Sequence, residues 1–403
     1  MRRRGGYAEN FSHRFGGTDP LPAKSPDIRR IWLQAVSVGE MLAIAPLLEA
    51  FKREERIEVY LTTTTSTGYK LAKEKYGELT IGIGYFPLDF WGFNARAWRK
   101  VQPDLCILME GERWPEHVHQ AKAHQVPVIS VNARLSDRSF RRSLKFRALL
   151  KPLANDITQV LCSSKRDEQR FKALGYPANR LATTGNLKLD VQVPLLSDAE
   201  KMQLRRELGL GAGLVLLGSS TWPGEETALI DAFQFARGRG LNVSLLLVPR
   251  HAERREELRG LLEKSGLTFQ FRSAGAATQE VEVAVGDTTG ELRKFTQLAD
   301  LVFVGKSLAP HDGGQTPVEA AVLGKPVLHG PHMTNFREIV RTLTEAGAVR
   351  EVASPIELRD AVVELLQDAA QREKLATAAR GWHEVNRGAT ERTLAVIRRQ
   401  LGR

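Results

Sequence analysis

Residues 301–336 place glycines and a carboxylate after a short apolar run, in an order that could bind a nucleotide. The run 301–305 is apolar, partly β-branched and ended by glycine, which predicts a buried parallel strand. Gly313 and Gly314 follow in a loop, where glycines would let backbone N–H groups approach a phosphate beside a helix N-terminus. Glu319, one turn into the predicted helix, could accept hydrogen bonds from ribose hydroxyls. The alternative is an ordinary strand–helix loop in which Glu319 only favours the helix start.

A second carboxylate motif lies near the N-terminus. Ser37, Gly39 and Glu40 come directly after a predicted strand and before a predicted helix. A carboxylate at this point could face a cleft between two domains, where Glu40 could act as a general base toward an acceptor hydroxyl. The alternative is that the helix dipole alone favours a glutamate at this position.

Two further polar clusters follow apolar strand patterns in the first half of the chain. Glu110 and Glu112, with a tryptophan beside them, end the run LCILM and are hard to explain by packing, so we interpret them as functional. Asn132 and Arg134 follow the next predicted strand, VPVISV. Carboxyl ends of parallel strands share one edge of a sheet, so these side chains should lie on the same side.

Polar loops in the second half also follow predicted strands. Arg250 ends the run LLLVP and offers a guanidinium suited to bidentate phosphate binding. Each of the other loops could reflect helix capping alone, but their shared position favours a ligand site. The loop residues are Ser220, Thr221, Asp287, Thr288, Gly290, Glu291 and Ser307.

The segment 134–147 carries six basic residues against one acid, Asp137, with Phe140, Leu144 and Phe146 interleaved; Leu149 and Leu150 extend its apolar side. This basic amphipathic pattern predicts contact with a phosphorylated lipid or an anionic bilayer surface. A solvated helix face is the alternative.

The composition bounds the class of protein. Hydrophobic residues make up 42% and charged residues 26%, which is typical of a soluble globular protein. No apolar run approaches ~18 residues, and no signal peptide is evident. Cys106 and Cys162 lie in apolar runs without metal-ligand spacing, and we interpret both as reduced core thiols of a cytosolic protein.

The net charge of +11 and pI near 9.7 indicate acidic partners. Nucleic acid is the least favoured of these, because no known module is evident and aromatics at 7% offer no stacking platform.

Strand–helix alternation on both sides of a proline-containing segment predicts an α/β protein with two doubly wound, Rossmann-like domains facing across a cleft. We expect a first domain at 1–190 with a basic arm at 1–28, a linker at 191–200 and a second domain at 201–385. A C-terminal helix at 386–403 could pack back on the first domain.

Taken in order, these motifs resemble the 3-deoxy-D-manno-octulosonic acid (Kdo) transferase family. The matching stretches span residues 32 to about 336 and read WLQAVSVGE, MEGERWP, VNARLS, TTGNLKLD, SSTWPGEE, VPRHAER, VGDTTGEL and GGQTPVEAA. The resemblance implies a GT-B fold with a CMP-Kdo donor held mainly by the second domain. It also implies inverting transfer to a lipid A precursor, a phosphorylated glycolipid, with no metal or other cofactor.

The resemblance also implies roles for individual residues. Glu40 falls on the family's catalytic base. The acceptor-side residues would be Ser37, Gly39, Glu110, Glu112, Asn132 and Arg134. The donor-binding residues would be Ser220, Thr221, Arg250, Asp287, Thr288, Gly290, Glu291, Ser307, Gly313, Gly314 and Glu319.

The resemblance further implies a place at the cytoplasmic face of the inner membrane. Family members usually begin with a membrane anchor helix, and this chain starts at about the point where that helix would end, as a trimmed chain would.

The sequence departs from the family pattern around the donor site. Trp222 and the pair Gln315–Thr316 stand where the family has histidine and histidine–asparagine, Lys306 stands where it has glycine, and Gln34 where it has histidine. Two rival hypotheses stay open, the first motivated by these departures and the second by the pI near 9.7. One is a GT-B transferase or 2-epimerase using another nucleotide sugar, such as a UDP-sugar, and the other is a non-catalytic protein that binds polyanions or membranes.

Overall fold

The computed structural model of the protein describes residues 9–191 and 193–402, and of residues 148–151 and 153 the backbone alone. The chain divides into two compact units, unit 1 (Met1–Asp190 with Asn386–Arg403) and unit 2 (Val191–Val385). Each unit holds a seven-stranded sheet whose neighbouring strands are all parallel. Parallel neighbours need crossover connections, which the helices supply. The prediction of two doubly wound α/β domains is confirmed.

The unit 1 sheet has the strand order β3-β2-β1-β4-β5-β6-β7. The central strands β4 and β5 are buried at every position, which is the expected pattern for strands covered on both faces. The strands are β1 (Arg29–Gln34), β2 (Ile57–Thr63), β3 (Gly82–Tyr85), β4 (Leu105–Met109), β5 (Val128–Ala133), β6 (Gln159–Cys162) and β7 (Leu181–Thr183).

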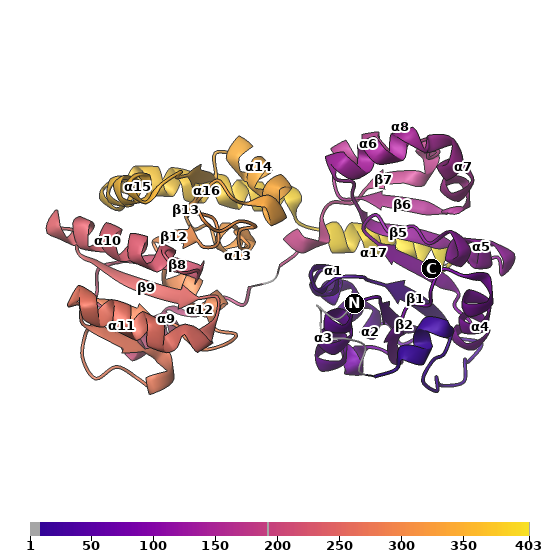
Figure 1. Ribbon diagram of the computed structural model, residues 1–403, viewed down its shortest axis with the longest axis horizontal. Helices are drawn as coiled ribbons and strands as arrows, with labels where there is room; N and C mark the ends of the chain where they lie inside the picture. The colour runs from indigo at the N-terminus through magenta and orange to yellow at the C-terminus, as the bar shows by residue number, and fades with distance from the viewer. Residues whose placement is uncertain (1–8, 192, 403) are drawn as a thin grey trace. The chain divides into compact units, whose positions relative to one another are not determined.

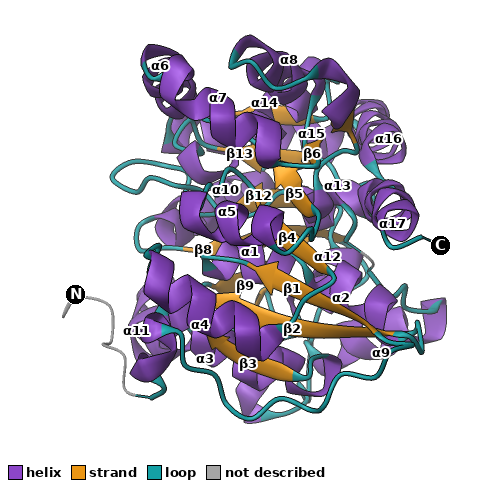
Figure 2. Ribbon diagram, turned by 90° about the vertical axis from the view of Figure 1, so that its right-hand side faces the viewer, coloured by secondary structure: helices purple, strands orange, loops and turns teal. Residues whose placement is uncertain are grey.

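Helices cover both faces of this sheet, with α2 and α17 on one side and α4 and α5 on the other (Figure 2). The alternation of β1 assigns its side chains, since Ile31 and Leu33 join the first of these cores and Trp32 the second. The helices are α1 (Val38–Ala43), α2 (Ala45–Lys52), α3 (Ser66–Tyr76), α4 (Trp91–Val101), α5 (Pro115–Ala123), α6 (Asp137–Lys145), α7 (Arg147–Asp156), α8 (Lys165–Ala173) and α17 (Ala389–Gln400).

The C-terminal helix α17 is part of unit 1. In Figure 1 it is the yellow helix among the indigo and magenta elements of that unit. Leu394 and Ile397 are fully buried against residues of β1, β2 and α2. Asp190 accepts a hydrogen bond of 2.6 Å from the Gly388 N–H just before the helix, and Arg398 pairs with Glu54 at 2.7 Å.

The expected basic arm at 1–28 is folded onto unit 1 over its described part, residues 9–28. This part contains a short 3₁₀ helix, η2 (Phe11–Phe15). The guanidinium of Arg14, within this helix, donates to the Phe86 carbonyl at 2.6 Å. Lys24 forms an ion pair of 2.8 Å with Asp104. Residues 1–8 lie outside the described residues.

The unit 2 sheet has the strand order β10-β11-β9-β8-β12-β13-β14. Its core lies between the sheet and three helices, α10, α11 and α15, which bury Phe233, Leu262 and Val362. The strands are β8 (Leu214–Thr221), β9 (Val243–Pro249), β10 (Phe269–Phe271), β11 (Val283–Val285), β12 (Leu301–Val304), β13 (Val327–His329) and β14 (Val349–Glu351).

The first helix of unit 2, α9, begins at Asp198, within the predicted linker 191–200. Ser197 caps α9 in a capping box with Glu200, and Gln297 accepts from the Leu196 N–H at 2.8 Å, so the second half of 191–200 already belongs to unit 2. The helices are α9 (Asp198–Glu207), α10 (Glu225–Gly238), α11 (Arg255–Ser265), α12 (Leu292–Leu298), α13 (Val318–Val322), α14 (Arg337–Glu345), α15 (Pro355–Gln367) and α16 (Ala369–Asn386).

Candidate functional site

In unit 1 the strand order reverses between β1 and β4, since β1 pairs with β2 on one side and β4 on the other. In a doubly wound sheet, the crevice at the carboxyl ends of such strands is the usual place for a ligand. Glu40 follows β1, while Glu110 and Glu112 follow β4. The topology therefore brings the loop of Glu40 and the loop of Glu110 and Glu112 to the same edge of the sheet.

Glu40 is buried in the first turn of α1, where its carboxylate is held by two donors. One oxygen accepts from the Val36 N–H at 2.8 Å and the other from the Ser37 hydroxyl at 3.0 Å. Burial raises the pKa of Glu40 above its ordinary value, the two bonds oppose that rise, and the charge of Glu110 adds to it. Glu40 thus contributes to the helix start and also lies close enough to Glu110 for their charges to interact.

Glu110 is held at the edge of the sheet by two cations. Its carboxylate lies 3.0 Å from the Lys188 ammonium and 2.8 Å from the Arg134 guanidinium. Its backbone has a φ of 54°, in the left-handed region that non-glycine residues rarely adopt. Sequence reasoning placed Glu110 and Arg134 in this group but missed Lys188. The motif TTGNLKLD contains that lysine, and its position between two buried leucines was the available signal.

Asn132 supports this arrangement from the end of β5. Its side-chain oxygen accepts from the Leu187 N–H at 3.0 Å and so fixes the short 3₁₀ helix η5 (Leu187–Leu189) that carries Lys188. Gly39 lies beside this lysine, since a Cβ built at that position would be 3.8 Å from the Lys188 ammonium, an ordinary contact distance.

Glu112 is a partly buried carboxyl in the same group. Burial, with repulsion from Glu40 and Glu110, raises the pKa of Glu112 to about 7. Burial raises the pKa values of both Glu40 and Glu112, and the two carboxyls interact, so Glu112 can hold or release a proton near neutral pH beside Glu40.

In unit 2 the strand order reverses between β8 and β12. Ser220 and Thr221 end β8, and Ser220 has a φ of 54°. The Thr221 hydroxyl is buried without a hydrogen-bond partner. Arg250 is exposed just after β9, where its backbone N–H donates to the Thr221 carbonyl at 3.1 Å. These residues meet at one edge, as predicted.

The loop before α12 uses its carboxylates within the protein. Asp287 accepts from the Ser273 backbone N–H at 2.9 Å and pairs with Arg255. Burial alone would raise the pKa of Asp287, but the bonds from Ser273 and Arg255 outweigh it and lower the pKa. Glu291 pairs with Arg272 at 3.3 Å. These two predicted donor residues are therefore anchored by ion pairs that rigidify the loop.

Thr288 and Gly290 complete that loop. The Thr288 hydroxyl donates to Glu291 at 2.5 Å. Gly290 has a φ of 89° and no atom within 4 Å of a Cβ built on it, so the turn there needs glycine for its backbone and not for lack of space.

The glycine loop after β12 differs from the expectation. The Gly313 N–H donates to the His332 carbonyl at 3.1 Å and the Gly314 N–H to the Lys306 carbonyl at 2.9 Å, so neither N–H group points freely to a phosphate. A Cβ at Gly314 would lie 2.3 Å from the Met333 sulfur, which explains the glycine by packing. The helix that follows, α13, has only five residues and adds little dipole.

Ser307 and Glu319 also have partners within the protein. Ser307 is fully buried, and its hydroxyl donates to the Val304 carbonyl at 2.6 Å and accepts from the Gly330 N–H at 2.8 Å. Glu319 lies on α13, 3.6 Å from the Arg293 guanidinium. Ser307 thus ties β12 to the loop after β13.

A residue that sequence reasoning did not single out holds the two loops together. Glu225, 2% exposed at the start of α10, accepts hydrogen bonds from four backbone N–H groups. The donors are Trp222 at 2.9 Å, Lys306 at 2.8 Å, Ser307 at 2.9 Å and Leu308 at 3.1 Å. The sequence offered only a helix-start glutamate as a signal, because three of its four donors lie some eighty residues away.

Two general features complete the description. Within residues 9–191 and 193–402, no group of three or more His, Cys, Asp or Glu side chains is arranged to hold a metal ion. Over the same part of the chain, no helix combines the length and apolar character needed to cross a membrane.

Known proteins are similar to this chain in sequence and in fold. A family model described as 3-deoxy-D-manno-octulosonic-acid transferase (kdotransferase) matches residues 9–191. The 3-deoxy-D-manno-octulosonic acid transferase of Haemophilus influenzae is 34% identical over 402 residues, covering 98% of this chain and 92% of that protein. The transferase of the same name from Bordetella pertussis is 34% identical over 415 residues, covering 100% of this chain and 94% of that protein.

The solved structure of Anabaena HepE in complex with UDP aligns with a TM-score of 0.60 and 17% identity, covering 93% of this chain and all of that one. This likeness concerns the fold and supports the GT-B class with its two Rossmann-like domains. The long, closely matching relatives decide the family. The chain belongs to the 3-deoxy-D-manno-octulosonic acid transferase family.

Proposed function

We propose that this protein is an inverting glycosyltransferase that moves Kdo from CMP-Kdo to a lipid A precursor in lipopolysaccharide biosynthesis. Two relatives that share a third of its sequence over nearly their whole length bear the name of that activity. The observation that carries the proposal is the buried Glu40 beside the Glu110–Lys188 pair at the strand reversal of unit 1.

In the proposal, Glu40 is the general base. A carboxylate with a raised pKa accepts a proton from a hydroxyl more readily than an ordinary one. The acceptor hydroxyl gives its proton to Glu40 while its oxygen forms a bond to the anomeric carbon of Kdo, and the bond from that carbon to the CMP phosphate breaks. Attack opposite the leaving group inverts the anomeric centre. Val36 and Ser37 keep the carboxylate oriented through the reaction.

The other residues of this edge would bind the acceptor. Lys188 and Arg134, both bonded to Glu110, supply positive charge next to Glu40 and could meet a phosphate of the glycolipid. Glu112, whose pKa is about 7, could donate a hydrogen bond to a sugar hydroxyl when protonated. Ser37, Gly39 and Asn132 would act by holding the base and the lysine in place.

Unit 2 would bind the donor at the β8–β12 edge. The leaving phosphate needs fixed positive charge, and the exposed Arg250 with Lys306 can supply it, so the proposal includes no metal ion or other cofactor. Asp287, Thr288, Gly290 and Glu291 would form a rigid wall of this site, because their ion pairs and hydrogen bonds fix the loop. Ser220, Thr221, Ser307, Gly313, Gly314 and Glu319 would line or support it.

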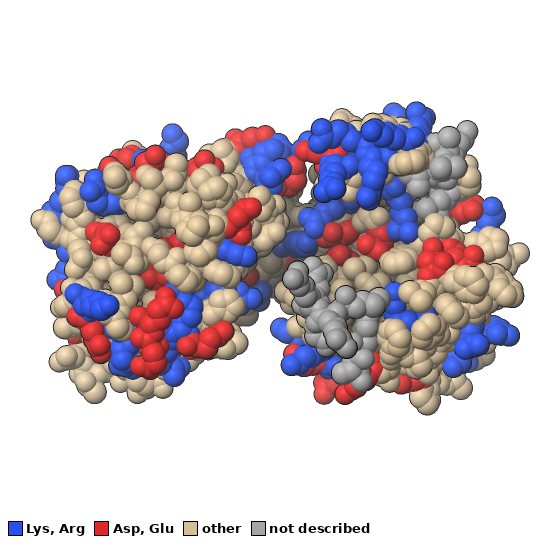
Figure 3. All heavy atoms as spheres, in the orientation of Figure 1, with Lys and Arg blue, Asp and Glu red and all other residues tan. Residues whose placement is uncertain are grey.

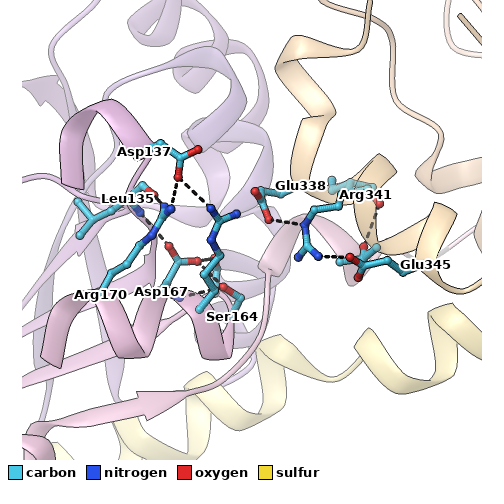
Figure 4. A network of polar contacts seen from close by, with 12 residues as sticks. Leu135, Asp137, Ser164, Asp167, Arg170, Glu338, Arg341 and Glu345 are labelled. Carbon is cyan, nitrogen blue, oxygen red and sulfur yellow. Dashed lines mark hydrogen bonds and ion pairs between the residues drawn. The ribbon is translucent and has the colours of Figure 1, made fainter. Parts of the chain in front are cut away.

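We further propose that unit 1 contacts the anionic cytoplasmic surface of the inner membrane, where a glycolipid acceptor would lie. Helix α6 buries none of its side chains, and Leu144 and Phe146 at its end are 41% and 53% exposed. Lysine and arginine atoms gather over α6 and α8 (Figure 3). The single acid of α6, Asp137, is already paired with Arg166 and Arg170 of α8 (Figure 4).

An exposed aromatic patch on the same unit supports membrane contact. Phe90 and Trp91, at the start of α4, are 59% and 67% exposed, and Phe93 packs between Phe90 and Phe15 at ring distances of 5.1 and 5.3 Å. A cluster of exposed tryptophan and phenylalanine rings suits the interface between lipid headgroups and acyl chains.

The test is transfer from CMP-Kdo to a tetra-acylated lipid A precursor, with wild type beside Glu40→Gln. Loss of a general base should reduce the rate by about 10²- to 10⁴-fold. Glu49→Gln is the matched control, since Glu49 is exposed on the neighbouring helix α2. A Glu40→Gln variant with wild-type turnover would remove the base assignment. Transfer from a UDP-sugar, with none from CMP-Kdo, would replace the donor.

A further inference from the structure

Trp222, directly after β8, lies at the centre of a cluster built from three loops. The Lys306 ammonium lies over its ring, 4.8 Å from the centroid. The His251 ring, from the loop after β9, is 5.2 Å away, and the His311 ring, from the loop after β12, is 5.4 Å away. These loops leave the three adjacent strands at the reversal of the unit 2 sheet, so the cluster lies where a ligand is expected.

The ammonium of Lys306 has no ion pair or hydrogen bond among the described residues, although it is only half-exposed. The carboxylates bonded to this loop have other donors: Glu225 accepts four backbone N–H groups, and Asp312 accepts from the Gly313 N–H and the Thr334 hydroxyl. The indole face is therefore its one described contact. A partly desolvated ammonium that meets only a ring can still accept a negatively charged ligand.

The backbone conformation at Lys306 does not favour a lysine. Its φ is 59°, in the region that favours glycine, and a side chain at such a position is strained. Glu225 maintains this conformation by accepting from the N–H groups of Trp222, Lys306, Ser307 and Leu308. One buried carboxylate thus fixes both the ring and the lysine that lies on it.

We infer that Lys306 binds an anionic oxygen of the sugar-nucleotide donor, with Trp222 holding the ammonium in the empty site and Glu225 as the positioning residue. The anion is either the phosphate of the nucleotide or the carboxylate of the sugar. This inference rests on the proposed function, since it assigns the anion-binding group of the same donor site. It makes the Trp222–Lys306 pair a determinant of which donor the protein accepts.

The test compares Lys306→Met and Lys306→Gly with wild type by calorimetric titration with cytidine, CMP, CMP-Kdo and UDP. Lys264→Met is the matched control, because Lys264 is exposed near the end of α11. Loss of a charged hydrogen bond should weaken binding of the anionic donor roughly 10- to 100-fold and leave cytidine and the control unchanged. A matching loss for CMP and CMP-Kdo assigns the phosphate, and a loss for CMP-Kdo alone assigns the sugar carboxylate.

Lys306→Gly separates this role from a structural one. Glycine relieves the strained backbone, so the unfolding midpoint of unit 2 should rise while donor affinity falls. If the lysine were purely structural, its replacement would lower both the unfolding midpoint and the donor affinity, or neither of them. Unchanged donor affinity in both variants overturns the inference, as does a wild type that binds no nucleotide. If wild type prefers UDP to CMP, the proposed function fails, and a loss of UDP affinity in Lys306→Met still supports the inference.

Discussion

Replacing Glu225 by glutamine tests how the loops after β8 and β12 are held together. The carboxylate of Glu225 accepts two N–H groups on each oxygen: Ser307 and Leu308 on one, Trp222 and Lys306 on the other. Glutamine has almost the same shape but keeps one acceptor oxygen and presents an NH₂ group at the other position. The variant therefore leaves two of the four backbone N–H groups facing a donor.

The expected cost follows from this count. A buried N–H group without an acceptor costs about 1–3 kcal/mol, so two of them would cost about 2–6 kcal/mol. Ser307 and Leu308 are buried, whereas Trp222 and Lys306 are partly exposed and can be reached by water. The amide should therefore keep its oxygen toward Ser307 and Leu308, which favours the lower part of the range, about 2–4 kcal/mol.

Hydrogen exchange of the intact chain in increasing urea measures this cost for each unit, which a single global unfolding transition cannot do for two units. Peptides from β8 and β12 should lose about 2–4 kcal/mol of opening free energy in Glu225→Gln. Peptides from β1 and β4 of unit 1 should not change. Glu263→Gln, the same chemical change at an exposed position of α11, should alter either set by less than about 0.5 kcal/mol.

Two results would refute the reasoning. A loss below about 0.5 kcal/mol in the β8 and β12 peptides would mean that the four hydrogen bonds contribute little net stability. An equal loss in both units would mean that the effect does not act through these loops.

Three more predictions concern unit 1. Because the pKa of Glu112 is raised from 4.5 to about 7, the free energy of unfolding should fall as the pH rises through this window. Urea unfolding at pH 5 and pH 8 should therefore show a smaller fall in this free energy for Glu112→Gln than for wild type. Leu394→Ala should cost about 2–5 kcal/mol in unit 1 peptides alone, because this fully buried side chain of α17 packs against the first sheet. The double change Phe90→Ser and Trp91→Ser should reduce co-sedimentation with vesicles of phosphatidylglycerol and phosphatidylethanolamine, while Ile356→Ser, at a comparably exposed position of unit 2, should not; equal binding of all three proteins would contradict the aromatic contact.

The sequence predicted the elements whose signals are local and long enough. Runs of four or more apolar residues, such as those of β4, β9 and β12, gave the alternation and the fold class. Ser197 and Glu200 have the spacing of a capping box, a local signal that the structure shows at the start of α9. The strands β10, β11 and β14 were not predicted; each has three residues, too few for a period to appear, although the equally short β7 and β13 were predicted.

Site residues were predictable by position and less so by partner. Glu40 and Glu110 were placed correctly at strand ends, but Lys188 and Glu225 were missed because their contacts join segments about eighty residues apart. The glycines after β12 illustrate the converse error. Their types suggested free N–H groups, whereas the loop folds back and uses these groups internally. Hydrogen-bond partners depend on tertiary structure, which a motif does not contain.

The return of α17 to unit 1 makes unit 2 an insertion within the chain of unit 1. A ribosome releases residues in order, and domains generally fold as their last residues emerge. The core of unit 1 lacks Leu394 and Ile397 until all of Val191–Val385 has been synthesised, so unit 2 can be complete while the earlier unit still exposes an apolar face. During synthesis the N-terminal part of this protein should therefore be the last to become protease-resistant, and the more dependent on chaperones.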